Sequence, residues 1–294
     1  MIKAALRADP TERGRTKVTA YRDIVYKIKD YVARITINRP KQYNAFTGDT
    51  LKELTLAFEA AGADEEVGVV VLTGTGDKAF SSGGDVNWEK EGGLERQILE
   101  PYLMHETVSH CPKPVIARVN GYCIGGANHL AYFCDFTIAA EHAIFGQNGP
   151  RVGSPACGAI VSYLTRVIGA KRAREMWMLS RRYSAAQALD MGLVNVVVPL
   201  AKLDEEVDKW CRELLALSPT CLKILKASFV EEFSYLFGQG DQLRRYMTTP
   251  EFWAEEQQEG ARAFLEKRAP DFSRFRRRPG SSGAATAEGR ETRN

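Results

Sequence analysis

The sequence lacks any long hydrophobic run. Its longest apolar stretch, VGVVVLTG at 67–74, falls far short of the roughly 18 residues that a membrane-spanning helix needs. The first residues are basic, but Asp9 and Glu12 interrupt them and no apolar segment follows, which argues against a secretory signal. A mitochondrial transit peptide is the alternative interpretation of this end. We therefore expect a protein of the cytoplasm with no membrane insertion.

Residues that bind metals or phosphates in known patterns are also scarce. No HExxH or GxxxxGK[ST] motif occurs, and GTGDKA at 74–79 lacks the third glycine of a dinucleotide fingerprint. Ser154 directly follows Gly153, so it does not sit in a G-x-S-x-G turn. The six cysteines form no CxxC pair, which favours buried thiols in a reducing compartment. We predict no metal and no tightly bound cofactor. The four histidines show no metal-ligand spacing: His105, His110, His129 and His142.

Composition and charge predict an ordinary globular protein with charged ends. The chain has 294 residues, of which 44% are hydrophobic and 26% charged. Of the net charge of +3, residues 1–20 carry +3 and residues 268–278 carry +4, which leaves −4 on the body. A mildly acidic body argues against nucleic-acid binding, and the arginine-rich segment at 274–279 is the one alternative place for phosphate contacts. We predict a flexible basic arm at 1–20 and a disordered tail at 279–294.

Hydrophobic periodicity predicts an α/β core at 21–200. A β-hairpin is expected over 24–28 and 32–38, and Thr47 is expected to cap a helix whose apolar residues include Leu54 and Phe58. From 203 to about 268 the pattern is helical, with Pro219 and Pro250 at helix starts. We assign 201–278 as a C-terminal helical region. Further buried strands are predicted at 67–74, 114–121, 136–140 and 194–198, and further helices around 158–168, 171–180 and 184–192.

Two glycine-rich turns carry the main functional signal. SSGGD at 81–85 and CIGGAN at 123–128 each follow a buried strand, about 45 residues apart, which indicates a repeated β/α unit. A backbone N–H at such a turn is a fixed donor, and two donors on one oxygen stabilise developing negative charge by roughly 3 kcal/mol each. We therefore predict that the two turns face one site. The alternative is that both are simple tight turns.

Several motifs resemble the crotonase superfamily of enoyl-CoA hydratases and isomerases. They are RPKQYNAF (39–46), DKAFSSGGD (77–85), PKPVIARVNGYCIGGANHLAYFCDFTIAAEHAIFGQ (112–147) and ALDMGLVNVVV (188–198). The resemblance runs from about residue 22 to 278. It implies a spiral of ββα units, coenzyme A thioester substrates, and trimers or dimers of trimers assembled through 201–278. It also implies an oxyanion hole formed by the backbone amides of Gly84 and Gly126.

The resemblance also locates missing acids. Hydratases of the superfamily use two glutamates, and the matching positions here are His129 and Gly149. Water addition needs an acid and a base at those places, so simple hydration is disfavoured. His129 is a candidate base that would take a proton near neutral pH, or else a packed core histidine.

A closer resemblance is to the branch of 1,4-dihydroxy-2-naphthoyl-CoA synthase and 2-ketocyclohexanecarboxyl-CoA hydrolase. IFGQNGPRVGS (144–154) and the segments at 171–195 and 259–279 carry it. It implies catalytic roles for Ser154 and Tyr246, and a bicarbonate ion beside Gly149 in place of the missing carboxylate. Ala156 stands where that branch has an aspartate. This is similar to 6-oxocyclohex-1-ene-1-carbonyl-CoA hydrolase, which favours ring opening over ring closure.

The remaining candidate residues fall into three groups. The resemblance places Gln147 and Cys157, with Gly149, in an anion or substrate pocket. Trp88, Glu89 and Glu91 lie in a loop that could cover the site. Asp85 is also a candidate helix cap. Contacts with coenzyme A are expected at Arg39, Lys41, Ala45, Lys78, Ser82 and Asp85.

The predicted activity is therefore enolate stabilisation followed by C–C cleavage of a cyclic β-ketoacyl-CoA, or the related Dieckmann-type ring closure. Two alternatives stay open at this point. One is an enoyl-CoA hydratase or isomerase. The other is a non-catalytic CoA-binding protein that kept the fold and lost its acids and bases.

Overall fold

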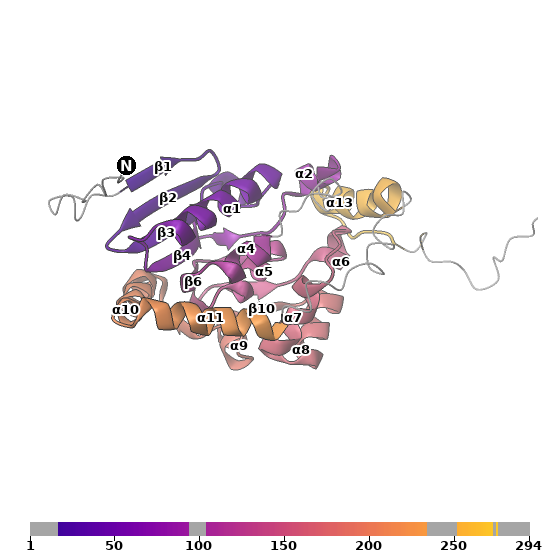
Figure 1. Ribbon diagram of the computed structural model, residues 1–294. Helices are drawn as coiled ribbons and strands as arrows, with labels where there is room; N and C mark the ends of the chain where they lie inside the picture. The colour runs from indigo at the N-terminus through magenta and orange to yellow at the C-terminus, as the bar shows by residue number, and fades with distance from the viewer. Residues whose placement is uncertain (1–16, 94–103, 234–251, 273–274, 276–294) are drawn as a thin grey trace, which may run out of the picture.

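The structure is a computed structural model that describes residues 17–93, 104–233, 252–272 and 275. Its strands form a large sheet and a small sheet (Figure 1). The seven-stranded sheet contains, in spatial order, β1 (Lys17–Ala20), β2 (Ile24–Lys29), β3 (Val32–Ile37), β4 (Val69–Gly74), β6 (Val115–Val119), β8 (Phe136–Ala140) and β11 (Val196–Val198). The four-stranded sheet contains β10 (Arg182–Ser184), β9 (Ile144–Gly146), β7 (Tyr122–Ile124) and β5 (Ala79–Ser81).

A ββα unit repeats three times through the middle of the chain. In each unit the first strand joins the large sheet, the second joins the small sheet, and a helix follows. Strands β4, β6 and β8 run parallel to their neighbours in the large sheet, and β5, β7 and β9 run parallel to one another in the small sheet, where β10 pairs antiparallel with β9. This arrangement confirms the predicted ββα spiral. The helices that complete the units are α2 (Val86–Lys90), α5 (Gly126–Phe133) and α6 (Gly149–Val152).

The central strands are apolar because both faces of the large sheet are covered. Every residue of β4 and β6 is buried. One face packs on the main core, to which Val70 and Leu72 belong. On the other face, Val69 and Val71 contact a smaller cluster that includes Leu203 of α10 (Leu203–Leu215). The alternation of strand side chains between two faces therefore fixes α10 against the sheet.

Helix α1 (Gly48–Ala63) begins where the sequence predicted. Thr47 caps it in a capping box with Thr50, and Leu54 and Phe58 are buried. Along the C-terminal half, Pro219 begins a helix as predicted, whereas Pro250 lies outside the described residues. The other helices of this part of the fold are α4 (Met104–His110), α7 (Ala159–Ile168), α8 (Ala170–Leu179), α9 (Ala185–Asp190), α11 (Pro219–Phe233), the π-helical turn η5 (Phe252–Glu256) and α13 (Gln257–Leu265).

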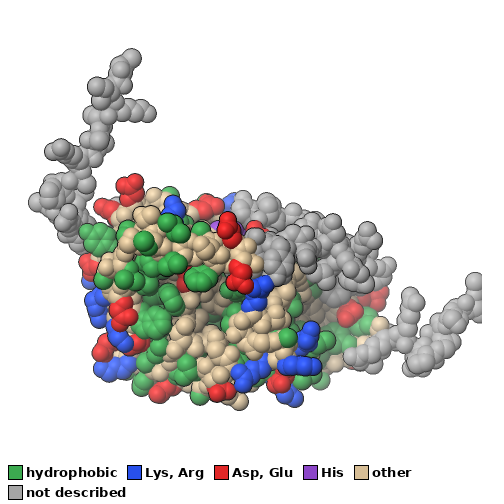
Figure 2. All heavy atoms as spheres, turned by 60° about the horizontal axis from the view of Figure 1, so that its bottom comes forward, with side chains coloured by type: hydrophobic (Ala, Val, Ile, Leu, Met, Phe, Trp, Pro, Cys, Tyr) green, Lys and Arg blue, Asp and Glu red, His purple; other side chains and the backbone are tan. Residues whose placement is uncertain are grey.

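A buried lysine anchors α11 to the core. The Lys226 Nζ lies 2.7 Å from a carboxylate oxygen of Asp135 and donates to the backbone carbonyls of Lys113 and Val108. Hydrophobic side chains on α11, among them Ile224 and Phe229, are nevertheless exposed. Helix α11 lies along the lower part of Figure 1, the side that is turned forward in Figure 2, where hydrophobic side chains gather over part of the surface.

Several expectations need correction. Residues 17–20 are not part of a flexible arm, because they form β1 and pair antiparallel with β2. The short strands of the small sheet were not predicted, since three residues are too few to show a period. Cysteines are less uniformly buried than expected: Cys157 is half-buried and Cys221 exposed. Residues 1–16 and 279–294 lie outside the described residues. In the described part of the chain, no helix combines the length and apolarity that crossing a membrane requires.

Candidate functional site

The fold places the two glycine turns side by side. Strand β5 leads into the first turn and pairs in parallel with β7, which leads into the second. A Cβ on Gly83 would lie 3.1 Å from the Gly126 nitrogen and 2.7 Å from the Ile124 oxygen, so the two backbones touch. Gly83 has φ +92° and Gly125 has φ +59°. In each pair the first glycine takes a conformation that other residues avoid, and this turns the second glycine's amide out of the strand.

Hydrogen bonding leaves the two predicted amides available. Phe46 N–H donates to the Gly83 carbonyl at 2.9 Å, and Asp85 N–H donates to the Phe46 carbonyl at 2.9 Å. Neither of these two hydrogen bonds uses the N–H of Gly84. The N–H of Gly126 belongs to the first turn of α5, where helical amides lack intrahelical partners. Both donors can therefore bind an oxygen atom that carries negative charge.

Two buried asparagines hold the first turn in place. The Asn44 side chain donates to the Ala79 carbonyl at 2.8 Å, and the Asn120 side chain donates to the carbonyls of Gly74 and Ala79. A Cβ on Gly74 would lie 2.1 Å from the Phe80 oxygen, so this loop doubles back on itself. No sequence pattern pointed to either asparagine, because their acceptors are backbone atoms far along the chain.

Glu89 is the acidic residue that sequence reasoning placed in a covering loop. In the structure it lies on α2 with only 6% of its surface exposed. Its Oε1 lies 2.1 Å from the point that a Cβ on Gly84 would occupy, so the carboxyl group packs directly on that glycine. Burial raises the pKa of Glu89 to about 7, a hydrogen bond from the Ser154 side chain lowers it, and the charge of Asp85 raises it.

The candidate base His129 lies beside Gln147 and Trp177. Burial lowers the pKa of its imidazole to about 3, against a smaller opposing effect from Gln147. His129 Nε2 lies 3.1 Å from Gln147 Oε1, and the ring packs at 5.1 Å from Trp177. Because burial disfavours the protonated form, the imidazole stays neutral, although part of the His129 surface is exposed. Its role as a base stays a prediction. Among the described residues, Gln147 Nε2 has no hydrogen-bond partner.

Backbone occupies part of the space beside Gly149. A Cβ on Gly149 would lie 2.4 Å from the Ser154 backbone oxygen, so this one direction is filled. The bicarbonate ion expected beside Gly149 stays a prediction. Ser154 itself is half-buried and reaches Glu89, as described above. Ala156 packs against the main hydrophobic core, and Cys157 is half-buried.

The expected coenzyme A contacts divide into two groups. Arg39 faces inward: its guanidinium donates to Asp85 at 3.2 Å, approaches Asp23 at 3.6 Å, and also donates to the Ala45 carbonyl. Asp85 in turn caps α2 by accepting from Asn87 N–H, which confirms the cap. Arg39, Ala45 and Asp85 therefore hold the loop together. In contrast, Lys41, Lys78 and Ser82 are exposed.

Helix α13 covers the neighbourhood of Glu89. It packs against α2 and α6, as Figure 1 shows at the yellow end of the chain. Gln258 Nε2 donates to the Lys90 carbonyl at 2.9 Å, and a Cβ on Gly260 would lie 2.4 Å from the Val152 carbonyl carbon. The first contact joins residues 168 positions apart in the sequence, and the second joins residues 108 positions apart. The predicted catalytic Tyr246 lies outside the described residues.

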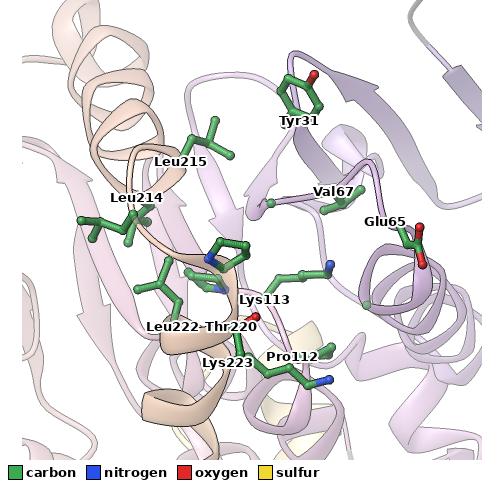
Figure 3. Close-up of a pocket in the computed structure, with 15 residues that line it drawn as sticks. Tyr31, Glu65, Val67, Pro112, Lys113, Leu214, Leu215, Thr220, Leu222 and Lys223 are labelled. Atoms are coloured by element: carbon green, nitrogen blue, oxygen red, sulfur yellow. The ribbon is translucent and has the colours of Figure 1, made fainter.

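A cavity of about 430 Å³ lies elsewhere (Figure 3). Leu214, Leu215 and Leu222 line one side of it, and Val67 and Glu65 line the other. Its lining includes Gly68 and Pro114, which directly precede β4 and β6, whereas the glycine turns follow β5 and β7. The cavity is therefore separate from the site. Within the described ranges, no group of three His, Cys, Asp or Glu side chains is placed to hold a metal ion.

Comparison with known proteins matches almost the whole chain. A sequence model of the family described as enoyl-CoA hydratase/isomerase matches residues 27–275. The chain is similar to the structure of an enoyl-CoA hydratase/isomerase from Xanthobacter autotrophicus Py2, with 34% identity, a TM-score of 0.70, and coverage of 84% of this chain and 93% of that one. It is also similar to an enoyl-CoA hydratase from Bacillus anthracis, with 31% identity, a TM-score of 0.66 and coverage of 85% and 98%. A third similar structure is an enoyl-CoA hydratase from Mycobacterium avium subsp. paratuberculosis K-10, with 29% identity, a TM-score of 0.72, and coverage of 86% of this chain and 99% of that one.

Proposed function

The chain belongs to the enoyl-CoA hydratase/isomerase family, and from this premise we propose that it opens the ring of a cyclic β-ketoacyl-CoA by hydrolytic C–C cleavage. Members of the family are acyl-CoA enzymes. The observation that carries the proposal is the contact between the two glycine turns, which puts the amides of Gly84 and Gly126 on adjoining backbones. Such a pair suits the oxygen of a thioester enolate.

The reaction proceeds in three balanced steps. Water adds its oxygen to the ring ketone carbon and gives one proton to a base. The bond between that carbon and the α-carbon then breaks, and its electron pair forms the thioester enolate, whose oxygen accepts from Gly84 and Gly126. A proton returns to the α-carbon, and the product is an open-chain carboxylic acid thioester that is heavier by one water.

The chemistry of the neighbouring residues supports cleavage over simple hydration. Hydration needs an acid and a base on the two sides of the substrate. Here His129 stays neutral because its pKa is about 3, and Gly149 carries no side chain at all. Ala156 likewise offers no carboxylate for ring closure of the naphthoate synthase type. The branch resemblance and these three positions point in the same direction.

A second candidate is hydration or isomerisation of an enoyl-CoA. The similar solved structures favour it, since they are enoyl-CoA hydratases or a hydratase/isomerase. A third is binding of coenzyme A thioesters without turnover.

Mass spectrometry separates these candidates. We expect incubation with 2-ketocyclohexanecarboxyl-CoA to give a product heavier by one water, with no change in crotonyl-CoA. Hydration of crotonyl-CoA with the ring ketone unchanged would replace the proposal with a hydratase. Binding of acetyl-CoA without turnover of either thioester would favour the non-catalytic protein.

We also propose that the C-terminal helices assemble the chain into a trimer or a dimer of trimers. Leu217, Ile224, Leu225 and Phe229 are each more than half exposed, which is costly for apolar side chains that stay in water. Sedimentation equilibrium gives the oligomeric state directly. A monomer at micromolar concentration would contradict the assembly.

A further inference from the structure

The geometry points to Glu89 as the group that exchanges a proton with the α-carbon of the bound thioester. This inference rests on the proposed function, because it requires an enolate at Gly84 and Gly126. It names a residue that neither the glycine turns nor the missing acids identify.

The Glu89 carboxyl group lies close to the place where the α-carbon would bind. The Glu89 carboxyl group packs on Gly84, the residue that supplies one of the two amides. An α-carbon is separated from its thioester oxygen by two bonds. A substrate whose oxygen accepts from the Gly84 amide therefore presents its α-carbon within a few ångströms of this glycine. Glu89 is the carboxyl group that the fold delivers there.

The other ionisable side chains near the glycine turns are held by partners of their own. Asp85 is engaged by Arg39 and by the amides of α2. His129 is hydrogen-bonded to Gln147, and its ring packs against Trp177. Among the described residues, Glu89 makes no ion pair, although it is nearly fully buried. A buried carboxyl group without a cation destabilises the fold, and such a group is characteristic of functional sites.

The surroundings of Glu89 allow its carboxyl group both to accept and to donate a proton. Burial brings its pKa to about 7, which is the range in which one group can both accept and donate near neutral pH. The Ser154 hydroxyl stabilises the ionised form, and Asp85 opposes it. The other charged side chains on the elements packed around α2 are Lys90, Arg151, Glu259 and Arg262.

The step itself is balanced. In ring opening, the Glu89 carboxylate takes one proton from the attacking water and becomes the carboxylic acid. After the C–C bond breaks, the acid gives this proton to the α-carbon and the carboxylate is restored. The last step is reversible, so the same carboxylate removes an α-proton from an unreactive saturated thioester and returns one from the solvent.

Hydrogen–deuterium exchange tests this assignment without requiring ring opening. Butyryl-CoA is incubated with the protein in D₂O, and deuterium at the α-carbon is measured by mass spectrometry. We expect exchange with the unmodified protein, at a rate that rises with pH and levels off above about 7. Glu89→Gln should lower the rate at least about 100-fold, and Glu89→Asp should restore part of it. Glu59→Gln, at an exposed glutamate on α1, is the matched control and should leave the rate unchanged.

Four outcomes of this experiment are informative. Loss of exchange in Glu89→Gln, with butyryl-CoA binding and the circular dichroism spectrum retained, supports the assignment. Equal exchange in Glu89→Gln and the unmodified protein overturns it, as does the absence of exchange in the unmodified protein while butyryl-CoA is bound. Exchange that depends on Glu89 without opening of 2-ketocyclohexanecarboxyl-CoA leaves the assignment standing and refutes C–C cleavage.

Discussion

Replacing Glu89 by glutamine should stabilise the protein at alkaline pH and leave it nearly unchanged at acidic pH. The carboxyl group has an ordinary pKa of 4.5 in the unfolded chain and a pKa of about 7 in the fold. Below pH 4.5 the carboxyl group is protonated in both states, so burying it adds no ionisation penalty to the free energy of folding. Between about pH 4.5 and pH 7 the unfolded state is ionised while the folded state still holds the proton, so the stability of the unmodified protein falls over this range and levels off above it.

The magnitude follows from the pKa difference. Each pKa unit corresponds to about 1.4 kcal/mol, so the whole shift is worth about 3 kcal/mol. Between pH 5 and pH 8 the loss amounts to about 2.5 kcal/mol, because the unfolded carboxyl group is already partly ionised at pH 5. Glutamine keeps the shape and packing of the side chain on Gly84 but does not ionise. The difference in unfolding free energy, Glu89→Gln minus unmodified protein, should therefore grow by about 2.5 kcal/mol over this range.

Urea denaturation followed by tryptophan fluorescence measures this difference at each pH. Subtracting the unmodified protein removes the pH dependence of every other group. Glu59→Gln replaces a solvent-exposed glutamate, so its difference should stay flat. A difference for Glu89→Gln that is the same at pH 5 and pH 8 would refute the reasoning, because it would mean that the folded carboxyl group ionises as freely as the unfolded one.

Three further substitutions test other parts of the structure. Lys226→Met should lower the free energy of unfolding by about 3 kcal/mol in urea denaturation, because it leaves Asp135 without its cation. Adding Asp135→Asn should recover part of this loss. No recovery would contradict a stabilising ion pair between the two residues. Gly126→Ala puts a Cβ 2.3 Å from the Phe46 ring and should lower kcat about 100-fold in the ring-opening assay, whereas an unchanged kcat would exclude the Gly126 amide. His129→Ala should leave the midpoint of the pH–rate profile in place because the imidazole is neutral above about pH 4; a lost limb would show that it titrates during turnover.

Local patterns fixed the positions of strands, caps and turns. The runs of β4 and β6 are apolar throughout because parallel strands are buried on both faces, and this is visible in the sequence. Thr47 and Pro219 mark helix starts because their effect depends only on the next few residues. The two glycine pairs predicted the site because a positive φ at Gly83 and at Gly125 is a local requirement that glycine meets.

Only the tertiary structure decided which side chains meet at those turns. Glu89 becomes a buried acid because α2 folds back on Gly84 and α13, from the far end of the chain, covers it. His129 looked like a base by its place in the chain, but desolvation, which depends on every surrounding residue, keeps it neutral. Arg39 faces Asp85 across 46 positions. The sequence determines local backbone preferences. Burial and electrostatic pairing depend on all the surrounding residues, and only the fold brings those residues together.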